Sequence, residues 1–230
     1  MKRTKTASNY GIMYTGKHLH QFNKRFLDIC ENSDNAHHGI IALFTVVFAG
    51  FTAWFAWEKC VGTVPRLVMT TLPLMVLAIV LALCIVPKDY ALRQIQYAMI
   101  LSLVSLFAIT GACAGNADLL SYGLYVLIFS GSAFGGMRMW SRFAVKRVWS
   151  ESKNVSEGAK MDFSLGIAVG LTASAAVTPF VKAIKSASVK AIVMTVVVVA
   201  MSVLLGFVAG TAWGNARYYC FLKRKKYDNL

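Results

Sequence analysis

The sequence predicts an all-α protein, a polytopic bundle of transmembrane helices with six spans and both termini in the cytoplasm. Three observations lead to this prediction. Six long runs of apolar residues carry no charged side chain, and 57% of the 230 residues are hydrophobic, with a mean hydropathy of +0.57. The Lys and Arg residues are also concentrated in connections that would share one side of a membrane. A soluble domain of this size is normally less apolar and could not bury six such helices in one core.

The six runs have the length that a membrane-spanning helix needs. About 17 to 25 apolar residues cross the hydrocarbon core of a bilayer, and an isolated Lys or Asp at its centre costs about 2.5 to 3.5 kcal/mol. All 24 bases and all 10 acids of the chain lie outside the runs, which favours insertion of every one. The runs are 39–57, 67–86, 95–114, 119–137, 163–181 and 191–213.

The runs divide the chain into three regions. Residues 1–38 form a basic cytoplasmic N-terminal region that includes a short amphipathic helix. Residues 39–213 form the six-helix transmembrane domain, which contains a basic cytoplasmic connection at 138–162. Residues 214–230 form a basic cytoplasmic tail.

The orientation follows from the distribution of Lys and Arg. With six crossings, 19 bases lie on the side that holds both termini and five lie on the opposite side. Cytoplasmic connections carry an excess of Lys and Arg, so both termini are expected in the cytoplasm. If residues 163–181 were re-entrant, the division would be a weaker 17 to seven. We expect an integral protein of a bacterial cytoplasmic (inner) membrane.

Glycines spaced four apart predict close contacts between helices. Helices gain little in lipid from burying apolar surface, so small residues that let two backbones approach drive their association. Seventeen glycines at random would give about one Gly-x-x-x-Gly pair, whereas the chain has five. We therefore predict helix packing, within one chain or in a homo-oligomer, through Gly111, Gly115, Gly131, Gly135, Gly166, Gly170, Gly206, Gly210 and Gly214.

The fifth run, 163–181, is rich in small and hydroxylated residues, which indicates a central helix. Such a helix packs tightly in a core, or it lines a pore in which hydroxyl groups contact water.

The apolar runs contain no group that would carry out membrane chemistry. They have no Asp, Glu, Lys, Arg or His, which argues against proton relays, ion-coupled carriers and voltage sensors, and also against intramembrane proteases. All four histidines lie in residues 1–38, where solvated side chains are favoured over a metal site. We predict no catalytic residue, no metal site and no cofactor.

Two of the five cysteines form a candidate disulfide. Cys60 and Cys113 both lie at the predicted outer boundary of the membrane, where an oxidising compartment permits a bridge.

Two amphipathic segments on the cytoplasmic side are candidate binding surfaces. Arg138, Arg142 and Lys146 form a stripe if the fourth helix continues beyond the membrane, and Arg147 lies beside it. The opposite arc is apolar, with Trp140, Phe143, Ala144 and Val148, and residues 21–31 place Phe22, Phe26 and Cys30 on one side. These segments either lie against anionic lipid headgroups or dock an acidic cytosolic protein. Nucleic acid is not expected, because the positive-inside bias explains the net charge of +14.

The sequence thus favours a non-catalytic membrane subunit that self-associates or anchors a cytosolic partner. The first alternative is a channel or carrier for small or uncharged solutes. The second is an enzyme acting on lipid, using loop residues such as Asp89, Arg93 and Asp118.

Overall fold

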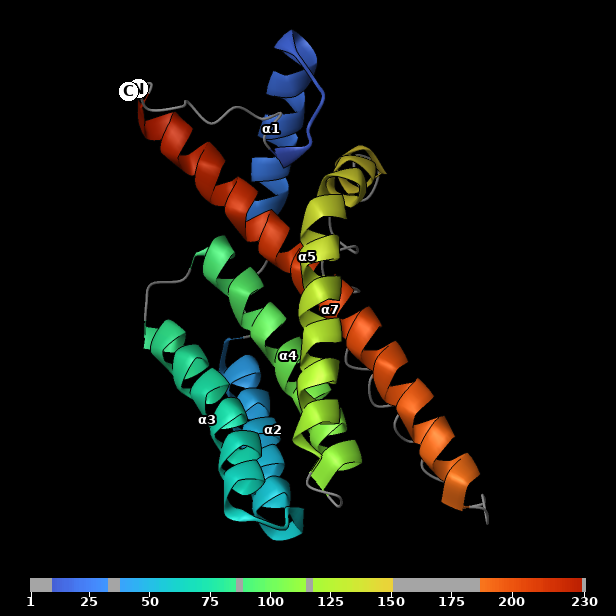
Figure 1. The fold of residues 1–230 in the computed structure, drawn as a ribbon. Coiled ribbons are helices and arrows are strands. Elements are labelled where there is room, and N and C mark those ends of the chain that lie inside the picture. The colour runs from blue at the N-terminus through green and yellow to red at the C-terminus, as the bar shows by residue number, and fades with distance from the viewer. Residues whose placement is uncertain (1–9, 33–37, 86–88, 115–117, 151–186, 229–230) are drawn as a thin grey trace, which may run out of the picture.

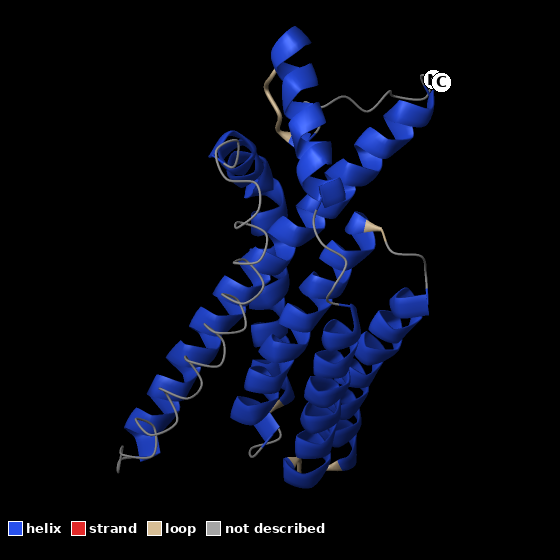
Figure 2. Cartoon of the chain, turned by 180° about the vertical axis from the view of Figure 1, so that it is seen from behind, coloured by secondary structure: helices blue, strands red, loops and turns tan. Residues whose placement is uncertain are grey.

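A computed structural model describes residues 10–32, 38–85, 89–114, 118–150 and 187–228. Every regular element in these ranges is helical, as Figures 1 and 2 show, and this confirms the all-α prediction for the described residues. The helices are α1 (Gly16–Asn32), α2 (His38–Lys59), α3 (Thr63–Ile85), α4 (Tyr90–Cys113), α5 (Leu119–Ser150) and α7 (Ala187–Asp228).

Four of these helices contain a segment long and apolar enough to cross a membrane, which indicates an integral membrane protein. The segments are Thr63–Leu83, Tyr90–Cys113, Leu119–Lys146 and Val189–Arg224. The run 163–181, with Gly166 and Gly170, lies outside the described residues.

Local interactions fix the start of α5 and the turn between α2 and α3. Asp118 caps α5, because its Oδ1 accepts hydrogen bonds from the backbone N–H groups of Leu120 and Ser121, both at 3.1 Å. The Ser121 hydroxyl donates to Asp118 Oδ2 at 2.5 Å, and these bonds lower the pKa of the Asp118 carboxyl. Gly62, at φ +99°, turns the chain between α2 and α3.

The described helices form a crossed arrangement. Figure 1 shows α5 and α7 crossing near their middles, with α4 beside both and the α2–α3 hairpin beyond α4. The buried face of α2 consists of small residues, Thr45, Ala49, Thr52, Ala53 and Ala56, each 8% exposed or less.

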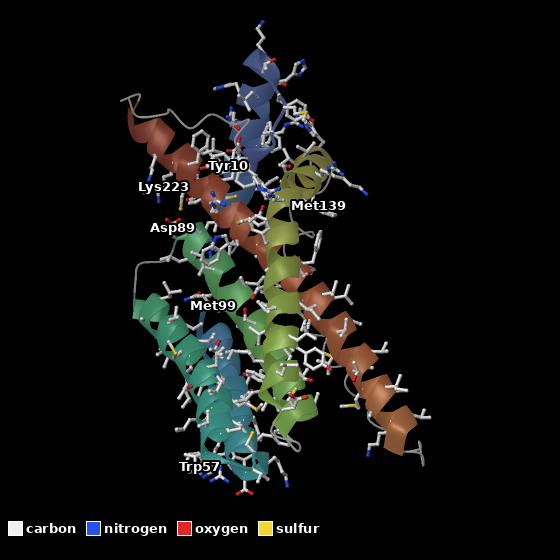
Figure 3. The ribbon with its side chains drawn as sticks, in the orientation of Figure 1. Tyr10, Trp57, Asp89, Met99, Met139 and Lys223 are labelled. Carbon is white, nitrogen blue, oxygen red and sulfur yellow. The ribbon has the colours of Figure 1, made fainter. Side chains whose placement is uncertain are left out.

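The segments that connect the helices lie at two ends of the molecule. α1 lies with the C-terminal parts of α5 and α7 and the start of α4, and in Figure 3 Tyr10, Lys223 and Asp89 lie toward this end. Trp57 and the α2–α3 turn lie at the other. The same segments share a side in the sequence prediction. α5 and α7 continue well past the predicted limits of their spans, Met137 and Trp213.

Candidate functional site

A cluster of aromatic and apolar side chains lies where α1 meets the C-terminal parts of α5 and α7, beyond the predicted spans. Phe22, Phe26 and Cys30, the face predicted to be apolar, are 0%, 4% and 1% exposed. We call the buried set the aromatic cluster; it consists of Ile12, Phe22, Phe26, Cys30, Tyr90, Ala91, Trp140, Ala144, Val148, Ala216, Tyr218, Tyr219 and Leu222.

Tyr218 lies at the centre of the aromatic cluster. Its ring centroid is 5.2 Å from that of Trp140, 5.4 Å from that of Phe26 and 6.2 Å from that of Phe22. The Tyr218 hydroxyl donates a hydrogen bond to Asn23 Oδ1 at 2.6 Å. A fully buried tyrosine normally has such a partner, and this one joins α7 to α1.

The segment before α1 contacts α5 through Gly11 and Tyr14. Gly11 has φ +75°, and a Cβ there would lie 2.8 Å from Ser141 Oγ. The Trp149 indole N–H donates to the Tyr14 hydroxyl at 3.1 Å. A side chain at position 11 is therefore disfavoured both by the left-handed backbone and by the neighbouring helix.

The apolar arc of α5 packs against other parts of the protein. Trp140, Ala144 and Val148 are 3%, 5% and 2% exposed within the aromatic cluster. Only Phe143 is half exposed, and it packs edge-on against Phe207 at 5.7 Å. Phe26 of α1 packs against Trp140 of this arc, with ring centroids 6.3 Å apart.

The charged arcs of α1 and α5 face outward. Arg142 and Lys146 are exposed, as are Lys24 and Arg25 of α1, and the Arg25 guanidinium lies 4.7 Å from the Trp149 ring centroid. The backbone of Arg147 is part of α5, whereas its side chain lies outside the described set.

Arg138 differs from the other residues of the predicted stripe. Its guanidinium lies 4.9 Å from the Phe134 ring centroid, one turn toward the predicted span. This direction is the usual one for a long helical side chain, which leans toward the helix N-terminus.

The α5–α7 crossing brings backbone against backbone. A Cβ on Gly210 would overlap the carbonyl oxygen of Ala133, and one on Gly206 would lie 2.5 Å from the carbonyl oxygen of Phe129. A Cβ on Gly214 would overlap the Trp140 ring. Three glycines one turn apart on α7 thus form the contact surface with α5.

The other glycines of the predicted pairs are placed differently. Among the described residues, a Cβ on Gly111, Gly131 or Gly135 would meet no atom within 4 Å, and Gly115 lies outside that set. On α5 the contact belongs to Gly136, whose Cβ would overlap the carbonyl oxygen of Phe207. Gly136 belongs to no Gly-x-x-x-Gly pair, so spacing alone did not find it.

The two candidate disulfide cysteines occupy the same apolar cluster but are both free. The Cys60 thiol donates to Met69 Sδ at 3.2 Å. Burial raises the pKa of Cys60, against the smaller opposing effect of Arg66, so the reactive thiolate is disfavoured.

The loop residues considered for lipid chemistry are far apart. Asp89 pairs with Lys223, with Nζ 3.4 Å from Oδ2, at one end of α4, and Asp118 caps α5 beyond the other end. A helix of 24 residues separates them by about 36 Å. They do not form one site, and the described residues hold no group of three His, Cys, Asp or Glu side chains placed to bind a metal.

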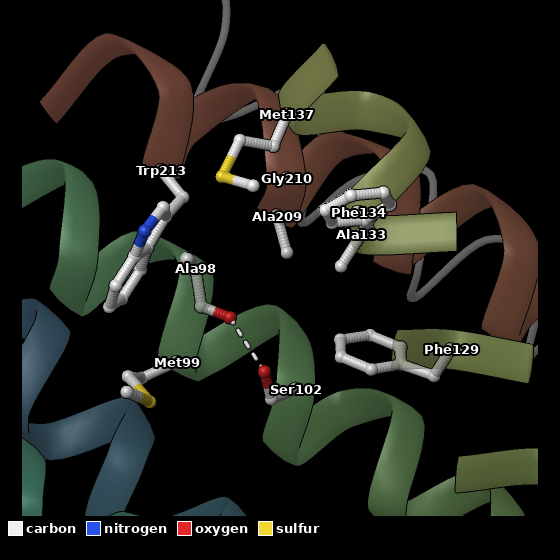
Figure 4. A pocket seen from close by; sticks show the side chains of 10 residues that line it. All are labelled: Ala98, Met99, Ser102, Phe129, Ala133, Phe134, Met137, Ala209, Gly210 and Trp213. Carbon is white, nitrogen blue, oxygen red and sulfur yellow. Dashed lines mark hydrogen bonds between the residues drawn. The ribbon is translucent and has the colours of Figure 1, made fainter. Parts of the chain in front are cut away.

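A cavity of about 300 Å³ lies between α4, α5 and α7 beside the glycine crossing (Figure 4). Its walls are almost entirely apolar. Its lining consists of Ala98, Met99, Ser102, Phe129, Ala133, Phe134, Met137, Ala209, Gly210 and Trp213.

The molecule thus offers a basic outer face over the aromatic cluster and an apolar cavity at the helix crossing. Comparisons of the chain with protein families, with curated proteins and with solved structures found no match.

Proposed function

We propose that this protein is a non-catalytic integral membrane subunit that uses a basic face to anchor an acidic soluble protein. In this proposal the chain spans the bilayer six times, both termini are cytoplasmic and copies of the chain self-associate. The observation that carries it is the aromatic cluster, which fixes α1 on the ends of α5 and α7.

The aromatic cluster favours a protein partner over the membrane surface. An amphipathic helix binds a bilayer through an exposed apolar face, and here the apolar faces of α1 and α5 bury each other. What remains outward is charged. Among the described residues, the exposed acids at this end are Asp28 and Glu31, and the half-buried Asp89 pairs with Lys223. The exposed bases at this end are Lys17, Lys24, Arg25, Arg138, Arg142, Lys146, Arg217, Lys223 and Arg224. Such a field attracts an acidic surface and speeds its encounter.

The helices that carry the basic face are also held to one another by contacts within the chain. Tyr218 and Trp149 tie α1 and the segment before it to α7 and α5 by hydrogen bonds. A surface whose helices are already ordered loses less conformational entropy on binding, which suits an anchoring subunit.

The test removes charge from the basic face without touching the aromatic cluster. The test variant is Arg142→Gln, Lys146→Gln. Its matched control is Lys59→Gln, Lys190→Gln, which changes two exposed bases at the opposite end of the molecule. After cross-linking in intact cells and gentle extraction, the first variant should insert normally yet lose an acidic protein that the wild type and the control retain. The interaction should weaken with salt, because exposed charges are screened over about 8 Å at physiological ionic strength.

Retention of every copurifying protein by the correctly inserted Arg142→Gln, Lys146→Gln variant would rule out this docking face. Light scattering of the wild type in the same detergent measures the proposed self-association.

A channel or carrier is the second candidate, and one observation favours it. The hydroxyls of Ser105 and Ser202, each 1% exposed, have no hydrogen-bond partner among the described residues. An unsatisfied buried hydroxyl costs about 1 to 3 kcal/mol, a cost that water or a polar solute between the helices would remove. Flux of small neutral solutes into liposomes separates this candidate from an anchoring subunit.

A further inference from the structure

We propose that the cavity between α4, α5 and α7 holds an acyl chain of an anionic phospholipid, with its phosphate bound by Arg138 and Arg217. This site uses two bases of the basic face, Arg138 and Arg217, but neither Arg142 nor Lys146, and it does not depend on a protein partner.

The walls of the cavity select an apolar occupant. They hold no charged residue, and their one hydroxyl, on Ser102, already donates to the carbonyl oxygen of Ala98 at 2.9 Å, the dashed line in Figure 4. The volume of about 300 Å³ is at the lower end of the range for small-molecule sites, about 300 to 1,000 Å³. It fits part of one hydrocarbon chain and excludes a whole lipid.

The rim of the cavity selects a negative headgroup. Phe134 and Met137 line the cavity; the Arg138 guanidinium lies 4.9 Å from the Phe134 ring centroid, and Arg217 Nη1 lies 3.2 Å from Met137 Sδ. Both arginines are exposed. The Arg217 guanidinium also lies 5.9 Å from the Tyr10 ring centroid. Two guanidinium groups that each contact a lining side chain can bind phosphate oxygens with charge-assisted, bidentate geometry.

The depth of the opening matches a lipid headgroup. The predicted spans end at Met137 and Trp213, which both line the cavity. Trp213 is 39% exposed, and indole rings favour the headgroup layer. A lipid whose phosphate contacts the arginines would therefore have its chain at the level of Phe134, Phe129 and Ser102.

Charge argues against a second copy of the chain as the occupant. A second copy in the same environment brings another Arg138 and Arg217 toward the first pair, and no Asp or Glu lines the cavity. Like charges brought together in a low-dielectric layer repel, whereas an anionic phospholipid neutralises them.

The test uses Trp213 as a reporter in vesicles. The full chain is reconstituted in phosphatidylcholine with increasing fractions of phosphatidylglycerol brominated on its acyl chains, which quench a nearby indole. The Trp213 signal is the difference between the wild type and Trp213→Phe. It should be quenched at a low fraction of brominated phosphatidylglycerol, and brominated phosphatidylcholine in a phosphatidylglycerol background should quench it weakly.

Two variants and their controls test the two halves of the site. Arg138→Gln, Arg217→Gln should raise the half-saturating fraction about tenfold, because each base near anionic lipid adds substantially to its binding, while Arg142→Gln, Lys146→Gln should leave it unchanged. Ser102→Leu should fill the cavity and abolish saturable quenching. Ser130→Leu removes a similar backbone-bonded hydroxyl on an exposed face and should have no effect.

Equal quenching of Trp213 by the two brominated lipids would overturn the proposal, and so would saturable quenching in Ser102→Leu. Quenching by neither lipid, together with an oligomer that Ser102→Leu disrupts, would assign the cavity to a second copy. Loss of a protein partner in Arg142→Gln, Lys146→Gln has no bearing on these results, so the two proposals fail independently.

Discussion

α5 and α7 contact each other in two regions that differ in the size of the side chains between them. At the crossing, Gly206 and Gly210 leave no side chain between α7 and the backbone of α5. Beyond Gly214, the same helices are separated by large rings, those of Trp140 and Tyr218, and α1 adds Phe22 and Phe26 to them.

The difference is the one expected if the crossing lies in lipid and the aromatic cluster lies in water. In lipid, burying an apolar side chain gains little, so association depends on close backbone approach. In water, burying an aromatic side chain contributes about 1.5 to 3 kcal/mol. The change from glycine to rings near Gly214 lies close to the predicted end of the span at Trp213, which is where the sequence prediction places the passage from lipid to water.

The largest effect is expected from Phe22→Ala. Truncating a buried phenylalanine costs about 3 to 5 kcal/mol, and this loss should release α1 from α5 and α7. Cys30, 1% exposed in the aromatic cluster, reports the release. Its labelling by a thiol reagent, followed by mass spectrometry, should accelerate about a hundredfold or more.

Met13→Ala, which changes a side chain that is 94% exposed, serves as its control. Unchanged protection of Cys30 in Phe22→Ala would mean that the rings do not hold α1.

An intermediate effect is expected from Gly210→Ala at the crossing. A single methyl group would overlap the Ala133 carbonyl, and overpacking of this kind costs about 1 to 3 kcal/mol. Gly131→Ala places the same methyl where no described atom lies within 4 Å, and it should gain up to about 1 kcal/mol of helix propensity. Thermal unfolding in detergent should shift down for the first variant and up, or not at all, for the second. Equal shifts would show that the backbone contact is not the cause.

The smallest effect is expected from Tyr218→Phe, which keeps the ring and removes its hydrogen bond to Asn23. The loss of one such bond costs about 1 kcal/mol, so Cys30 labelling should accelerate about fivefold. In a double-mutant cycle with Asn23→Ala, the two effects should not add. Additive effects would separate the hydroxyl from its assigned partner.

The sequence predicted the apolar helices because hydropathy is a local property of the chain. Charge-free runs of adequate length predicted the apolar parts of α3, α4, α5 and α7. Hydropathy does not mark the ends of α5 and α7: the charge-free runs stop at Met137 and Trp213, while the helices continue to Ser150 and Asp228, where their apolar faces pack in the aromatic cluster with α1.

The contacts between helices were only partly accessible from the sequence. Spacing drew attention to Gly206, Gly210 and Gly214, which face α5. Gly136 makes an equally close contact without a partner four residues away. The Ala and Thr face of α2 carries the same information as a glycine pair, since any small residue permits close packing, yet a search confined to glycine passes over it.

The two candidate sites could not be predicted from the sequence alone, and the reason differs between them. The amphipathic pattern of α1 and α5 was clear, but amphipathicity does not say whether lipid or another helix covers the apolar face. The cavity is lined by three helices, α4, α5 and α7, whose lining residues run from Ala98 to Trp213 in the sequence. No spacing of residues along one segment could have indicated it.

α7 is a single helix of 42 residues, about 63 Å long, and it crosses α5 at Gly210. From that point, about 35 Å of helix extends to Ala187 and about 27 Å to Asp228. The crossing point at Gly210, which also lines the cavity, divides the helix into these two parts. A rotation of this helix about the crossing would move its two ends in opposite directions.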